Sequence, residues 1–286
     1  MRQLSVISIC LCSALALAAC SGPTSEEEVE RAIQDVIASD EASLNEIMLS
    51  VADPNEAAAY YRRLLAEQPD RIDYQRGLGT SLVRAKKSIE AAAVWRNVTQ
   101  HPLSNNDDKV DYADALIRAG EWDEAEVVLD SIPPTIETYK RYRLEAMVAD
   151  SNNEWDHADS FYETAVGLTT KPSSVLNNWG YSKLTRGDFR DAERLFFEAL
   201  NYDRDLFTAK NNLVLARGAQ RNYKMPVIEA SQVERAQLLY TLALSAVKQG
   251  DITIGKGLLQ DAIDTHPQHF EEAVRSLRAL ESNISN

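Results

Sequence analysis

The sequence predicts an all-α fold, a right-handed solenoid of helix-turn-helix hairpins with a capping helix at each end. Two columns of small residues predict it. One recurs in steps of 34, 33 and 34 residues and the other in steps of 34, 34, 33 and 34. Such a period is typical of stacked hairpins, because one hairpin cannot bury its apolar face alone. The two columns are Gly79, Ala113, Ala146 and Gly180, and Ala57, Ala91, Ala125, Ala158 and Ala192.

Residues 173–206 form the clearest unit, in which two helical patterns flank Gly187. Gly180 and Ala192 are expected where the two helices approach most closely. Gly187 is expected to adopt a positive φ after the first helix, which glycine does without strain. Large residues follow the second small column with the same spacing, at Tyr61, Trp95, Leu129, Tyr162 and Phe196. A fourth column follows three residues later, at Leu64, Val98, Ile132, Ala165 and Ala199. The pattern resembles the tetratricopeptide repeat (TPR), and four columns in one register argue against the alternative of unrelated amphipathic helices.

Around this unit the chain divides into five segments. They are interpreted as a lipoprotein signal peptide (1–19), a lipidated tether (20–24), an N-terminal helical cap with a degenerate repeat (25–71), the TPR array (72–267), and a C-terminal capping helix with a tail (268–286).

Prolines explain the irregular places in the array. Pro133 and Pro134 shorten one second helix and account for the 33-residue step. Pro226 falls where a small residue belongs in a second helix, and proline disrupts a helix interior. Residues 224–231 are therefore expected to form a loop or a truncated helix, after which the register resumes at Ala243.

The N-terminus carries a short apolar run that starts after Arg2 and ends in small residues, as a signal peptide does. Leu17-Ala18-Ala19-Cys20 resembles the lipobox of bacterial lipoproteins. The resemblance implies that Cys20 becomes the first mature residue and carries acyl chains, which anchor the protein in the cell envelope. By the same resemblance, Ser21 in place of an aspartate implies the outer membrane rather than the inner one. The alternative is an ordinary secretory signal with a cysteine near its cleavage site.

Composition argues against catalysis and against nucleic acid as a partner. The four histidines form no zinc-binding motif, and no glycine loop precedes a Lys-Ser/Thr pair that could hold phosphate. No catalytic residue, metal site, cofactor or small-molecule substrate is therefore expected, although an enzyme with an unrecognised site stays an alternative.

Without residues 1–19 the chain has 29 Lys and Arg against 44 Asp and Glu, a net charge of −15. Such a chain suits a neutral or basic polypeptide and repels nucleic acid.

The first helices of a TPR array line its concave face, where we expect a partner to bind. Two asparagine pairs lie 34 residues apart on these helices, and an amide can both donate to and accept from a peptide backbone. The candidate groove residues are Asn177, Asn178, Tyr181, Asn211, Asn212 and Leu215. The alternative is that these asparagines only bond neighbouring repeats.

The C-terminal half resembles a specific family. NNWGYSKLTRGDFRDAERLFFEAL, ERAQLLYTLALSAVKQGD and GKGLLQDAIDTHPQHFEEAVRSL look like the TadD family, TPR lipoproteins of tight-adherence (Flp) pilus systems. The resemblance covers residues 173–281 well and the N-terminal half only in architecture. It implies a non-enzymatic role in pilus assembly, with the outer-membrane secretin or another pilus component as partner. The alternative is a general periplasmic scaffold for cell-wall hydrolases or outer-membrane protein assembly.

Overall fold

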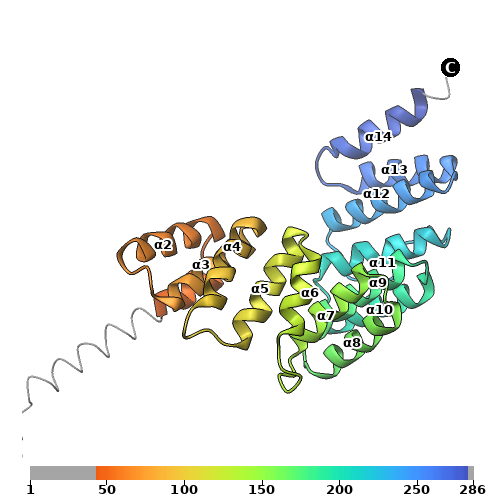
Figure 1. Cartoon of the computed structure of the whole chain (residues 1–286). Helices are drawn as coiled ribbons and strands as arrows, with labels where there is room; N and C mark the ends of the chain where they lie inside the picture. The colour runs from red at the N-terminus through yellow and green to blue at the C-terminus, as the bar shows by residue number, and fades with distance from the viewer. Residues whose placement is uncertain (1–42, 283–286) are drawn as a thin grey trace, which may run out of the picture.

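The structure, a computed structural model, describes residues 43–282, and Cys20 and the expected signal peptide lie outside this range. Helices follow one another in a curved array from α2 to α14, and residues 43–282 contain no strand (Figure 1). Residues 43–50 are also helical. The helices are α2 (Pro54–Glu67), α3 (Ile72–Arg84), α4 (Ser88–Gln100), α5 (Asn106–Ala119), α6 (Trp122–Asp130), α7 (Tyr139–Ser151), α8 (Trp155–Gly167), α9 (Ser173–Thr185), α10 (Phe189–Tyr202), α11 (Phe207–Ala219), α12 (Gln232–Lys248), α13 (Ile252–Thr265) and α14 (Glu271–Ser282). The predicted all-α solenoid is confirmed.

Consecutive helices pack as hairpins, and each hairpin packs onto the next. The periodic columns supply the core of this arrangement. All five residues of the second small column are fully buried, and the five large residues that follow them are at most 2% exposed. Because each large side chain fills the space beside a small one, every repeat buries its apolar face against its own partner helix and its neighbour.

The hairpin of α9 and α10 shows why its small residues are needed. A Cβ atom added to Gly180 would lie 2.6 Å from Cε1 of Phe196, which is itself fully buried. Gly79 meets Trp95 in the same way, with 2.6 Å to Nε1. The aromatic ring of the second helix therefore lies directly against the backbone of the first, as expected for Gly180.

The turn between the two helices of a repeat requires a left-handed backbone. Gly187 has φ +93°, as predicted. The same turn position is held by Lys86, Asn153 and Arg221, with φ values of 59°, 61° and 58°. An L-residue is strained in this region, so these three turns keep the geometry at a cost that Gly187 avoids.

The array is interrupted after α11. Residues 220–231 connect α11 to α12 and contain no helix. Of the two expected structures, a loop or a truncated helix, the structure has the loop. Pro226 cannot donate a helical hydrogen bond. The Tyr223 hydroxyl donates to Asp251 Oδ2 at 2.6 Å and thereby holds the connection against the start of α13. The helix α12 then begins at a capping box formed by Ser231 and Glu234.

The array ends with α14, which buries Ala273 against the core that α12 and α13 form. Between residues 43 and 282, none of the helices is both long enough and apolar enough to span a bilayer.

Candidate functional site

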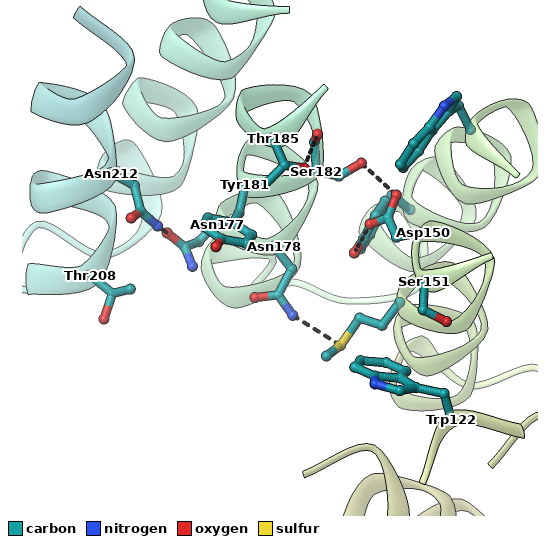
Figure 2. A pocket seen from close by; sticks show the side chains of 13 residues that line it. Trp122, Asp150, Ser151, Asn177, Asn178, Tyr181, Ser182, Thr185, Thr208 and Asn212 are labelled. Atoms are coloured by element: carbon teal, nitrogen blue, oxygen red, sulfur yellow. Dashed lines mark hydrogen bonds between the residues drawn. The ribbon is translucent and has the colours of Figure 1, made fainter. Parts of the chain in front are cut away.

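The first helices of three successive repeats border one open cavity. Its volume is about 430 Å³. Residues of α7, α9 and α11 line it, and Trp122 at the start of α6 and Trp155 at the start of α8 contribute aromatic side chains. Figure 2 shows Trp122 at one end of the cavity. The lining residues are Trp122, Met147, Asp150, Ser151, Trp155, Tyr162, Asn177, Asn178, Tyr181, Ser182, Thr185, Thr208 and Asn212. We call this cavity the groove.

Four of the six residues that the sequence suggested line the groove: Asn177, Asn178, Tyr181 and Asn212. Tyr181 projects from α9 with 53% of its surface exposed. The Nδ2 atom of Asn178 lies 3.4 Å from the sulfur of Met147, a weak acceptor, so its half-buried amide keeps capacity for a ligand.

The other amides are engaged between repeats. Asn212 Nδ2 donates to Asn177 Oδ1 at 3.1 Å, and both side chains are buried (Figure 2). Asn211 Oδ1 accepts from the Thr241 hydroxyl at 2.8 Å and, like Leu215, is outside the groove lining. These three asparagines therefore form hydrogen bonds between neighbouring repeats, which was the alternative to peptide binding. Of the four asparagines, Asn178 is thus the one whose amide does not bond a neighbouring repeat through a strong acceptor. That the six residues together bind a partner remains a prediction.

Asp150, at the C-terminal end of α7, is a groove residue that sequence reasoning missed. Its Oδ1 accepts from the Ser182 hydroxyl at 2.6 Å and its Oδ2 from the Tyr162 hydroxyl at 2.9 Å (Figure 2). Burial raises the pKa of the Asp150 carboxyl, and the two hydroxyl donors, together with the nearby positive charge of Arg186, offset this only in part. Burial also raises the pKa of Tyr162 well above its usual value, so this phenol stays a donor. The carboxylate is thus held in place by neutral groups.

Two tryptophans, Trp122 and Trp155, extend the groove toward α6 and α8. An aromatic residue recurs at this turn of the repeat, at Trp122, Trp155 and Phe189, and the sequence alone indicates only a structural role for it. Within residues 43–282 neither indole N–H has a hydrogen-bond acceptor. The guanidinium of Arg186 lies 5.5 Å from the centre of the Trp155 ring. Their periodic spacing was visible in the sequence, but their common cavity was not.

The basic side chains around Asp150 are paired elsewhere. Arg186 forms ion pairs with Asp159 and Asp188, and Lys183 pairs with Asp159 at 2.8 Å. Arg143, on α7, lies 3.5 Å from Asp114. Asp150 is therefore the one charged residue among the described residues that line the groove. Across residues 43–282, no three His, Cys, Asp or Glu side chains gather as a metal site would require.

Comparisons with known proteins support the architecture. No protein family model and no curated protein matches the chain. Among solved structures, the Cut9–Hcn1 tetramer of the APC/C matches with TM-score 0.58 and 16% identity over 84% of this chain and 47% of that one. A TPR protein from Parabacteroides merdae matches with TM-score 0.52 and 13% identity over 91% of this chain and all of its own.

Together with the buried columns, these matches identify the fold. The chain is an all-α tetratricopeptide-repeat solenoid. Human IFIT1, solved as a dimer with PPP-AAAA, is similar with TM-score 0.55 and 16% identity over 79% of this chain and 59% of that one. The TPR chain spans less than two thirds of both Cut9 and IFIT1. At these identities the likeness is one of fold alone.

Proposed function

We propose that this TPR solenoid is a non-enzymatic protein-binding scaffold, and that its groove holds an extended segment of a protein partner. The supporting observation is the groove itself, which crosses the first helices α7, α9 and α11. An extended peptide laid across successive helices would meet the amide of Asn178, the exposed phenol of Tyr181 and the hydroxyl of Thr208. These groups can recognise a peptide backbone without requiring one side chain.

The proposed cellular role is assembly of a tight-adherence pilus at the bacterial outer membrane. The lipobox ending at Cys20 and the TadD-like C-terminal half support it, and both are properties of the sequence. The partner we propose is the secretin or another pilus component, which a membrane-anchored scaffold would guide into place. Acyl chains on Cys20 would supply the anchor, because an acidic surface gains nothing from anionic lipids.

Photocrosslinking in native envelopes tests the groove and the partner together. A photoreactive amino acid replaces Tyr181, and captured proteins are identified by mass spectrometry. We expect capture of a secretin or a pilus subunit. The matched control carries the same amino acid at Tyr202, an equally exposed tyrosine on α10 outside the groove lining, and should not capture that protein.

The other outcomes discriminate. Capture of cell-wall hydrolases or outer-membrane assembly proteins by the Tyr181 variant would replace the pilus role with the general scaffold role. Equal capture by both variants would place binding outside the groove. Normal piliation and normal secretin multimers after deletion of the gene would contradict the pilus role whichever protein is captured.

Lipid attachment has its own test. Cys20→Ser should abolish labelling by a palmitate analogue and release the protein from the membrane fraction, because the acylated sulfur is lost. The paired control is Cys12→Ser, which changes a cysteine inside the expected signal peptide and should leave labelling intact. Persistent labelling of Cys20→Ser would refute the assignment.

A further inference from the structure

The electrostatics of the groove indicate which side chain it accepts. Asp150 carries the charge of the lining, and its hydrogen-bond donors are the neutral hydroxyls of Tyr162 and Ser182. Among residues 43–282 no basic side chain forms an ion pair with it, since Arg186 and Arg143 pair with Asp159, Asp188 and Asp114. The charge of Arg186 is near enough to act on the Asp150 carboxyl, but Arg186 forms no ion pair with it. The groove thus contains a partly buried anion without a directly paired cation.

The geometry of the carboxylate leaves room for a ligand. A carboxylate offers about four acceptor positions, and each oxygen of Asp150 accepts one hydroxyl hydrogen. Burial raises the pKa of Asp150 although the hydroxyl donors and the nearby Arg186 charge lower it, so the carboxylate is compensated only in part. A cation entering the groove would bring both hydrogen-bond donors and the missing charge.

The walls suit the rest of such a side chain. Trp122 and Trp155 approach the same cavity from successive turns, and Tyr181 stands exposed on α9. Aromatic faces attract a cation, and aromatic surface also covers the methylene stem of arginine or lysine. The net charge of −14 for the whole chain favours a basic segment at longer range.

We propose that the groove binds a peptide segment through an arginine or lysine side chain, whose cation lies beside Asp150 and whose stem lies against Trp122 and Trp155. This inference rests on the proposed function, because it names the chemistry of the segment that the same groove holds. It assigns Asp150 as the residue that selects a basic side chain over a neutral or acidic one.

Peptide selection tests the preference directly. The full-length protein in detergent micelles is used to select binders from a random library of dodecapeptides, and the best peptide is measured by fluorescence anisotropy. We expect an arginine or lysine at one shared position. Replacing that residue with citrulline or acetyl-lysine, which keep its shape and remove its charge, should weaken binding roughly tenfold.

A variant then assigns the effect to Asp150. Asp150→Asn should bind the charged and the neutralised peptide with nearly equal affinity, because the charge that distinguishes them is gone. The matched control is Glu163→Gln, which removes a carboxylate from the exposed face of α8 and should preserve the tenfold preference. Circular dichroism checks that each variant is folded. The comparison of the charged and the neutralised peptide uses the wild-type protein, so it tests the preference for a cation even if Asp150→Asn does not fold.

Two failures are distinguishable. In one failure, Tyr181→Ala weakens peptide binding and Tyr202→Ala does not, but the charged and neutralised peptides bind equally well. The groove would then still be the binding site, and the proposed selection of a basic side chain would be wrong. The same conclusion follows if Asp150→Asn keeps the full preference for the charged peptide. If no peptide is selected, or binding is indifferent to Tyr181→Ala, both the proposed groove and this inference are overturned.

Discussion

The contact between Gly180 and Phe196 makes a sharp prediction about stability. Gly180→Ala would place a methyl group 2.6 Å from Cε1 of Phe196 and 2.8 Å from its Cδ1, well inside van der Waals contact. Phe196 is fully buried between α9 and its neighbours, so the ring cannot swing out into solvent. Overpacking of this kind costs about 1–3 kcal/mol.

A competing effect must be subtracted. Alanine is favoured over glycine inside a helix by about 1 kcal/mol. The net loss expected for Gly180→Ala is therefore about 1 kcal/mol. Gly257→Ala supplies the matched control, because Gly257 also lies inside a helix, α13, and an added Cβ there would meet no atom within 4 Å. Only the propensity gain remains, so that variant should be stabilised by about 0.5–1 kcal/mol.

Urea denaturation followed by far-ultraviolet circular dichroism measures both variants. We expect the midpoint to fall for Gly180→Ala and to rise for Gly257→Ala, although the chemical change is the same. Phe196→Leu in the Gly180→Ala background should recover part of the loss, since the shorter side chain leaves room for the methyl group. Equal shifts in the same direction for both glycines would refute the close approach of α10 to the backbone of α9.

Three further predictions concern the turns and the buried polar groups. Lys86→Gly should stabilise the protein by about 0.5–1 kcal/mol, because Lys86 has φ 59° and glycine relieves that strain; an unchanged urea midpoint would contradict this. Burial alone would raise the pKa of Asp108, but hydrogen bonds from Arg76 and from the Asn105 backbone amide lower this pKa overall. The ionised carboxylate therefore stabilises the fold above about pH 4, the usual pKa of an aspartate. This stabilisation is lost as the pH falls through the folded pKa of Asp108. Asp108→Asn should therefore lose about 1–3 kcal/mol at neutral pH. The difference from the wild type should shrink as the pH falls through the folded pKa of Asp108 in parallel urea titrations; a difference that stays constant with pH would argue against the ion pair. Asn212→Ala should cost about 1–3 kcal/mol in the same assay, because it leaves the buried Asn177 Oδ1 without its donor.

The repeat architecture could be predicted from the residues because it depends on local patterns. A helical hairpin needs small residues at its crossing, an aromatic residue beside them and a left-handed residue in its turn. Gly180, Phe196 and Gly187 show all three in one unit. The loop after α11 could be anticipated as one of two alternatives from Pro226, because a missing backbone N–H disrupts a helix wherever it occurs. These rules act within one repeat, so the sequence contains them.

The groove depends on how repeats are placed relative to one another. The sequence placed Asn177 and Asn212 at recurring positions on first helices, but only the stacking of α9 on α11 brings their amides within 3.1 Å and engages them with each other. Asp150 and Trp155 come from the hairpin of α7 and α8, whereas Trp122 comes from the repeat before it, and no periodic rule indicates that the three share a cavity. The period of the sequence thus determines the solenoid. The way the helices stack determines which side chains form bonds between repeats and which line the groove.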